Sequence, residues 1–243
     1  MHQSLRCLAL LTVSGLAVGA LSSCSLVKGD TYEDDGTLSG KITSVRLDNG
    51  SGGATINGVS GGRSLSLHRR IEYRGDKPDG PTHRIENGVL ILSGCSGHCS
   101  VNYTVDVPAG IPVSGDVSSG AVHLSKVGSV KVTTSSGRVE MNGVTGTVQV
   151  KTTNGRITGE GIRSSQIQAQ TSNGRINLTP DTPANVHART SNGSITLTLP
   201  RAGYRVTAET NNGDKNIDVP NDPSGQYELG LKTSNGDITV KNA

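Results

Sequence analysis

The sequence contains no Phe and no Trp among its 243 residues, and only 2% of it is aromatic. Most protein interiors take much of their buried area from aromatic rings, so this chain must fill its interior with Val, Ile, Leu and Thr. An excess of charge of one sign is also lacking, because 23 basic residues stand against 20 acidic ones, a net charge of +3. A dedicated nucleic-acid binder carries a strong basic excess, so no nucleic-acid partner is expected.

A long hydrophobic run is missing as well. The longest apolar run covers residues 8–21, shorter than the roughly 20 residues that a membrane-spanning helix needs. It follows Arg6 and ends in Leu21-Ser22-Ser23-Cys24, which resembles the lipobox of bacterial lipoproteins. The sequence therefore predicts a lipoprotein signal peptide at 1–23, lipidation of Cys24 and an extracytoplasmic protein anchored to the cell membrane by its lipid. Residues 24–40 are expected to form the lipidated end and a flexible spacer.

Cysteine is scarce, with four residues in the chain. Cys7 lies in the predicted signal peptide and Cys24 in the lipobox, which leaves Cys95 and Cys99. An exported protein folds where disulfides form, so a Cys95–Cys99 disulfide is expected. A metal site with His98 between two thiolates is the alternative, but one Cys-x3-Cys without a second ligand pair is a weak zinc signal. No metal and no cofactor are expected.

What the chain does contain is one motif repeated at intervals of about 19 residues. Each copy reads Thr, then two of Ser, Thr or Asn, then Gly. A more degenerate copy ends at Gly120, and an eighth at Gly52, because residues 46–59 align without gaps with residues 131–144. The six regular copies end at Gly137, Gly155, Gly174, Gly193, Gly213 and Gly236.

Apolar and polar residues alternate on both sides of each motif glycine, which predicts two short strands per repeat with one face buried. After Gly213 a two-residue insertion would place Ile217 and Val219 in the apolar slots. An Asn-Gly corner also suits a hairpin, so a hairpin meander is the alternative. Stacked coils explain better why like residues recur in like slots, and they would align an inward Thr column and an Asn column at the corner, each forming a ladder along the stack.

The sequence therefore predicts an all-β domain over residues 41–243, a single parallel β-solenoid of about eight coils of roughly 19 residues each. A non-repeat excursion is expected at 63–105. Within it, Glu86-Asn87-Gly88 predicts a turn into a strand at 89–92, and residues 101–107 predict a strand that returns to the solenoid.

The lipobox, the Thr-Ser-Asn-Gly corners and the strand that runs into Val107-Pro108-Ala109-Gly110 resemble the bacterial β-strand-repeat family labelled "putative adhesins", formerly a domain of unknown function. The resemblance covers about residues 41–243. It implies a right-handed parallel β-solenoid outside the cytoplasm, and it supplies no active site to transfer.

One column of the repeat is a candidate binding site. The residue after the motif glycine is Arg138, Arg156 and Arg175 in three consecutive copies, so these arginines would stack about 4.8 Å apart. Neighbouring charges at that spacing repel by roughly 0.9 kcal/mol in water. An anionic polymer or glycan would relieve the repulsion, and Lys151 and Arg189 could extend the site. The alternative is a solvated face without a ligand.

For function we expect a non-enzymatic surface lipoprotein that binds an envelope polymer, an extracellular glycan or a protein partner. A partner of a membrane protein in envelope-stress signalling is one alternative, and a carbohydrate-active β-helix enzyme is another. Two or three carboxylates within about 5–10 Å in one groove would favour the enzyme. No catalytic residues are predicted, and the carboxylates available are Glu140, Glu160, Asp214, Asp218 and Asp237.

Overall fold

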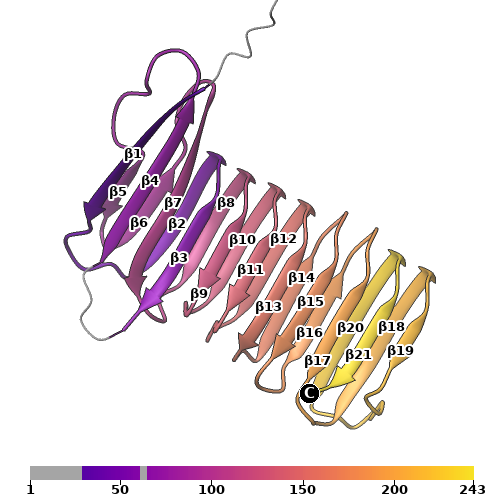
Figure 1. The fold of residues 1–243 in the computed structure, drawn as a ribbon. Coiled ribbons are helices and arrows are strands. Elements are labelled where there is room, and N and C mark those ends of the chain that lie inside the picture. The colour runs from indigo at the N-terminus through magenta and orange to yellow at the C-terminus, as the bar shows by residue number, and fades with distance from the viewer. Residues whose placement is uncertain (1–28, 61–64) are drawn as a thin grey trace, which may run out of the picture.

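The computed structural model describes residues 29–60 and 65–243, and within these ranges it contains strands and no helix. No helix in the described ranges is therefore long and apolar enough to cross a membrane. Two long, mostly parallel sheets lie face to face and form an elongated stack (Figure 1). The expected all-β architecture with stacked parallel strands is confirmed, and the hairpin meander is wrong.

Each repeat supplies one strand to each sheet, and the strands pair with their equivalents in neighbouring repeats. One sheet, here sheet B, has the order β18-β20-β16-β14-β12-β10-β8-β2-β6-β5. Its strands are β2 (Ser44–Ser51), β5 (His83–Glu86), β6 (Val89–Ser93), β8 (Val113–Ser119), β10 (Val130–Ser136), β12 (Val148–Asn154), β14 (Gln166–Gln170), β16 (Asn185–Arg189), β18 (Tyr204–Asn212) and β20 (Tyr227–Asn235).

The other sheet, sheet A, has the order β1-β4-β7-β3-β9-β11-β13-β15-β17-β21-β19. Its strands are β1 (Asp30–Thr37), β3 (Ala54–Val59), β4 (Ser66–Tyr73), β7 (Cys99–Pro108), β9 (Val122–Ser125), β11 (Val139–Asn142), β13 (Ile157–Ile162), β15 (Ile176–Pro180), β17 (Ile195–Leu199), β19 (Lys215–Ile217) and β21 (Ile238–Asn242).

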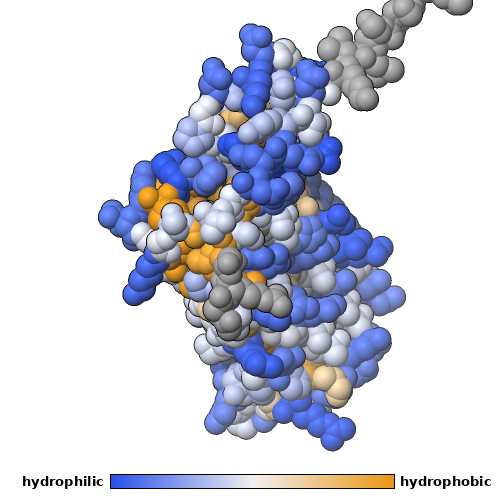
Figure 2. Space-filling view, turned by 60° about the vertical axis from the view of Figure 1, so that its left-hand side comes forward, coloured by the Kyte–Doolittle hydropathy of each residue, from blue (hydrophilic) through white to orange (hydrophobic). Residues whose placement is uncertain are grey.

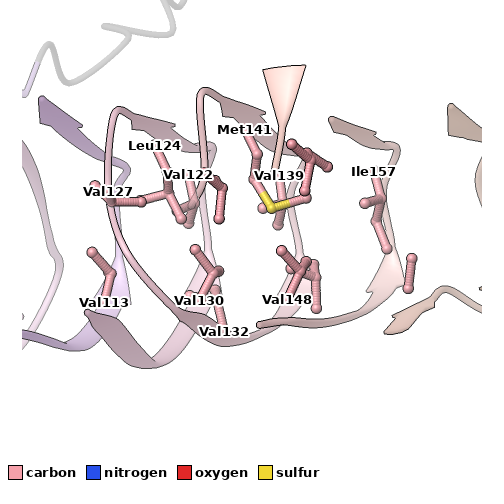
Figure 3. Close-up of a cluster of buried hydrophobic side chains, with 14 of the residues drawn as sticks. Val113, Val122, Leu124, Val127, Val130, Val132, Val139, Met141, Val148 and Ile157 are labelled. Carbon is pink, nitrogen blue, oxygen red and sulfur yellow. The ribbon is translucent and has the colours of Figure 1, made fainter. Parts of the chain in front are cut away.

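The core is a thin layer of aliphatic side chains between the sheets. Val113, Val130 and Val148 form one inward row of sheet B, and Val122 and Val139 belong to the facing row of sheet A (Figure 3). All five are at most 2% exposed. Period-two alternation therefore buries small β-branched residues without needing aromatic rings.

The motif glycine allows neighbouring rungs to approach closely at the corner. A Cβ on Gly155 or Gly174 would lie well inside van der Waals contact of the backbone carbonyl oxygen of the motif glycine one rung away. Because neighbouring rungs lie this close, hydroxyls of inward threonines can donate to these carbonyls, as Thr171 Oγ1 does to Gly155 O at 3.0 Å. The predicted Thr column is buried except for the half-buried Thr210, and five of its six hydroxyls bond to glycine carbonyls instead of to each other, while the Thr134 hydroxyl has no partner among the described residues.

The corner asparagines do bond to each other. Each side-chain Nδ2 donates to the Oδ1 of the next residue at 2.8–2.9 Å, through Asn212, Asn235, Asn192, Asn173 and Asn154. The order of this amide ladder differs from the order of the sequence, since Asn235 stands between Asn192 and Asn212.

The order of the amide ladder differs from the sequence order because two whole coils exchange places at the C-terminal end of the stack. Strands β20 and β21 lie between β16–β17 and β18–β19 in their respective sheets (Figure 1). The outermost rung is therefore 204–217 and not the chain end. The predicted insertion is also wrong, because Lys215 pairs with Ile238 and Ile217 with Val240, so Lys215 occupies an inward slot.

The N-terminal end of the stack is formed by the excursion at 63–105, which likewise runs outward beyond earlier strands and then returns. Its strands β6 and β7 stack in parallel outside β2 and β3, while β4 and β5 close the end in antiparallel pairing. The turn at Asn87-Gly88 has positive φ at both residues, and the strands at 89–93 and 99–108 confirm the two predicted segments.

The flexible spacer predicted at 24–40 is wrong over residues 30–37, because these form β1, which pairs antiparallel with β4 along its whole length. Opposite charges face each other across the pair. Asp35 meets His68 at 2.9 Å, Asp34 meets Arg69 at 2.7 Å and Glu33 meets Arg70 at 3.5 Å. The predicted signal peptide 1–23 and the lipidation site Cys24 lie outside the described residues.

The N-terminal end of the core is closed by a polar cluster around Arg69, which is only 7% exposed. Its guanidinium donates to both carboxylate oxygens of Asp34 at 2.7 Å and to Thr82 Oγ1 at 3.0 Å. The Tyr103 hydroxyl lies 2.6 Å from the same Thr82 oxygen, and burial raises the pKa of Tyr103 to about 12.

Figure 2 shows apolar side chains reaching the surface at this N-terminal end among hydrophilic neighbours, and Ile85 of β5 is one half-buried apolar residue there.

Cys95 and Cys99 are joined by a disulfide between β6 and β7, with their Cα atoms 6.1 Å apart. The predicted pairing is confirmed.

Candidate anion-binding corner and the adjoining sheet faces

Three arginines occupy the same corner position on consecutive rungs. Their backbone carbonyls accept hydrogen bonds from the neighbouring rung: Arg138 O from Val122 N, Arg156 O from Val139 N, and Arg175 O from Ile157 N, at 2.9–3.0 Å. Parallel stacking separates the arginines by about 4.8 Å, and all three are exposed. We call these three residues the arginine corner.

The column changes sign along the stack. Beyond Arg175 come Ser194, then Asp237, then Asp214, in the order set by the exchanged coils. Read in sequence order, Asp214 would stand next to Ser194. The arginine corner is therefore a basic stretch of three rungs, followed on the same ridge by a neutral rung and two acidic rungs.

The arginines differ in their surroundings. Arg138 Nε lies 3.5 Å from Glu140 Oε1, and Glu140 Oε2 lies 2.8 Å from Nδ1 of His123. Among the residues that the structure describes, no carboxylate is within ion-pair distance of Arg156 or Arg175. These two guanidiniums therefore keep their donors for a ligand, while that of Arg138 is partly engaged.

Lys151 and Arg189 lie on the outer face of sheet B, in one row with Gln170 between them. The next member of this row is Lys232, because β20 is inserted beside β16. Lys232 Nζ contacts Glu209 Oε2 at 2.5 Å, and this hydrogen bond lowers the pKa of Glu209. Sequence reasoning missed Lys232 because only the coil exchange brings it next to Arg189.

The candidate carboxylates separate into two groups. Glu140 and Glu160 line the same shallow hollow on the outer face of sheet A. Asp214, Asp218 and Asp237 lie on the last two rungs at the opposite end of the stack. Glu140 and Glu160 are one rung and two residues apart, a diagonal of roughly 8 Å. In the described part of the chain, no group of three or more His, Cys, Asp or Glu is placed to hold a metal ion.

The family model described as Toastrack DUF4097 matches residues 103–243. No curated protein matches the sequence.

Several solved structures are similar over most of their length. One is described as a putative adhesin from Bacteroides fragilis, with 14% identity and a TM-score of 0.47, covering 88% of this chain and 97% of that one. A putative cell adhesion protein from Clostridium sporogenes has 14% identity and a TM-score of 0.35, with coverage of 88% and 100%. A structure described as a putative lipid binding protein from Parabacteroides distasonis has 12% identity and a TM-score of 0.41, with coverage of 89% and 95%.

The family model covers the regular repeats, the Arg138–Arg175 stretch and the exchanged coils, which together make up more than half of the sequence. The resemblance to the β-strand-repeat family is thereby confirmed, and the chain belongs to the Toastrack DUF4097 family.

Proposed function

We propose that this chain is a non-enzymatic, surface-anchored lipoprotein of the bacterial envelope, an adhesin-like module that binds anionic polymers at its arginine corner. In this proposal residues 1–23 are a signal peptide, Cys24 carries lipid, and the rest is a right-handed solenoid of about eight regular coils in an extracytoplasmic location. The supporting features are the lipobox, the disulfide and the repeated polar surface.

The anchor and the fold together define where the domain would sit. Only four residues lie between Cys24 and Gly29, the first described residue, and the five extended steps from Cys24 to Gly29 span at most roughly 18 Å. Since β1 is held against β4, no long spacer follows. The N-terminal end of the stack would therefore lie close to the bilayer, with the arginine corner further along the stack.

The observation that carries the binding proposal is the stacking of Arg138, Arg156 and Arg175 on consecutive exposed rungs. Each guanidinium presents planar donors that suit phosphate or carboxylate, and a polyanion can engage several rungs at once. Lys151 and Arg189 on sheet B add positive charge on an adjoining face.

A second candidate function, glycan cleavage, is favoured by one observation, the location of Glu140 and Glu160 in one hollow. Both oxygens of Glu140 already face His123 and Arg138. If the chain cleaved a glycan, new reducing ends would accumulate with the wild-type chain and not with Glu160→Gln.

The binding proposal is tested with the full chain and immobilised polyphosphate at low and moderate salt. We expect retention that weakens with salt, and the variant with Arg138, Arg156 and Arg175 all changed to Ser should lose it. The logarithm of the binding constant decreases with the logarithm of the salt concentration, and removal of three phosphate contacts should make this negative slope shallower by roughly two units for any binding that remains.

A matched control changes Arg74, Arg163 and Arg201 to Ser, three exposed arginines in separate loops that follow β4, β13 and β17. This control alters the net charge equally but should retain the polymer. If both triple variants lost polymer retention equally, net charge alone would explain the retention, and the arginine corner would be refuted as a site. Capture of a membrane protein without any polymer retention would instead favour the signalling role.

A further inference from the structure

The outer face of sheet A contains a hollow of about 390 Å³ over β3, β9, β11 and β13. We call it the sheet-A hollow. Apart from the backbone at Leu124 and Met141, it is lined by polar side chains: Asn57, His123, Ser125, Glu140, Asn142, Thr158 and Glu160.

The hollow exists because two neighbouring outward rows of sheet A each contain a short side chain, Ser125 on β9 and Thr158 on β13. One row runs Asn57, Ser125, Asn142, Glu160, and Ser125 is its smallest member. In the other row, Thr158 follows Glu140 on the next rung. Longer side chains surround the hydroxyls of Ser125 and Thr158 and form the walls of the hollow. The hollow therefore results from the difference in side-chain length at these register positions.

The walls are held in place by contacts with one another and with residues beside the hollow. Asn57 Nδ2 donates to Asp106 Oδ1 at 3.1 Å, and Glu140 lies between His123 Nδ1 and Arg138 Nε. Side chains fixed in this way lose less rotational freedom when a ligand binds. The hollow is therefore organised before any ligand arrives.

The chemistry of the lining matches hydroxyl groups. Amides and hydroxyls from Asn57, Ser125, Asn142 and Thr158 both donate and accept, and the Glu160 carboxylate only accepts. A sugar hydroxyl likewise donates and accepts, whereas a phosphodiester chain offers acceptors only. A lining that mixes both roles over adjacent rungs is suited to a saccharide.

The hollow also adjoins the arginine corner. Arg138 and Arg156 each stand two residues before a lining residue, Glu140 and Thr158, and Arg138 Nε lies 3.5 Å from Glu140 Oε1. We call these two arginines beside the hollow the arginine rim. We infer that the sheet-A hollow binds the hydroxyls of an acidic saccharide whose anionic groups meet the arginine rim. The anionic part of this inference rests on the proposed function, and the saccharide part does not.

The test compares full-length wild type with Ser125→Leu, which fills the hollow without changing any charge. Thr179→Leu is the matched control, since Thr179 follows Glu160 in the same row but lies outside the hollow. Binding is measured to polygalacturonate, to polyphosphate of similar length and to neutral dextran, with circular dichroism to verify folding. The variant Asn142→Ala provides a second probe that removes hydrogen bonds instead of adding bulk.

We expect Ser125→Leu to weaken polygalacturonate binding about tenfold, the loss of one or two hydrogen bonds, and to change polyphosphate binding less than twofold. Asn142→Ala should act in the same direction, and Thr179→Leu should have no effect. Polygalacturonate binding that is unchanged in both hollow variants would overturn the inference while leaving the arginine corner intact. Equal losses for polygalacturonate and polyphosphate would also overturn it. Dextran binding sensitive to Ser125→Leu, without polyphosphate binding, would support the hollow and refute the arginine corner.

Discussion

At the scale of single residues, the motif glycine is a steric requirement of the stack and not a turn preference alone. At Gly174 an added Cβ would meet the carbonyl group of Gly155 and the amide nitrogen of Arg156, which are backbone atoms and cannot rotate away. The same corner supplies the carbonyl that accepts the Thr171 hydroxyl. Close approach and side-chain bonding therefore depend on one missing methyl group.

We expect Gly174→Ala to lower the free energy of unfolding by about 1–3 kcal/mol, because the extra carbon forces neighbouring rungs apart. Gly50→Ala is the control, since a Cβ there would have no neighbour within 4 Å. Urea denaturation of both variants measures the difference. Equal midpoints would show that the corner can widen at no cost.

The Asp34–Arg69 pair gives a second residue-scale prediction. The hydrogen bond from Arg69 lowers the pKa of Asp34 below its usual 3.8. A carboxyl with a depressed pKa in the folded state contributes stability above its unfolded pKa, and the contribution is lost as the pH falls through the folded value. Asp34→Asn should therefore cost about 1–3 kcal/mol near neutral pH, a range reduced because Asp34 is one-third exposed.

The difference between wild type and Asp34→Asn should shrink toward zero between neutral pH and an acid pH below the depressed folded-state pKa of Asp34, because the wild-type carboxyl is then increasingly protonated. Asp79→Asn, at an exposed loop position, controls for a change of charge at this end. Chemical denaturation at both pH values gives the result. A difference that does not vary with pH would mean that Asp34 acts through packing and not through its charge.

At the scale of secondary-structure elements, sequence periodicity predicts strands well and predicts their partners less well. Alternating Val and Ile around each motif glycine identifies the strands up to β17, and for β10 to β15 the neighbours in space are also neighbours in sequence. The coil exchange is not predictable in this way, because a coil that begins at Tyr204 and one that begins at Tyr227 present similar apolar slots to β16. Which of the two pairs with β16 depends on packing along the whole rung.

The acidic segment at 30–37 shows a second limit of sequence patterns. Asp30, Glu33, Asp34 and Asp35 look like a solvated spacer when read alone, but each of the last three faces a basic residue of β4. Complementary charges on segments far apart in the sequence produce no periodic pattern, so local sequence patterns do not predict that the two segments pair. The candidate site was more predictable, because the arginine corner lies within the regular repeats.

The outermost strand β19 also has a feature that only the register reveals. Lys215 stands in the inward slot that Ile238 and Ile195 occupy on the next two rungs. A charged residue in an inward slot of a short edge strand opposes pairing with another chain. Lys215 thus protects the sheet-A edge at this end of the stack.

At the scale of the whole molecule, the exchanged coils make the last coil internal. Strand β18 pairs with β20, and β20 in turn pairs with β16. We expect a chain without residues 227–243 to lose amide hydrogen-exchange protection throughout 204–217, because that segment would have no strand beside it. Stacking in sequence order would instead leave β18 paired with β16 and protected. Exchange measured by mass spectrometry on the full and shortened chains distinguishes the two.

The coil exchange also determines when folding can finish. During synthesis, residues 204–217 are made before the segment that must pass between them and β16, so the outer rung cannot dock until residues 227–242 are available. Repeat proteins of simple order can extend one unit at a time from a folded nucleus. Here the units 204–217 and 227–242 must assemble together, so a chain that stops before residue 227 would present 204–217 to proteases as unpaired strands.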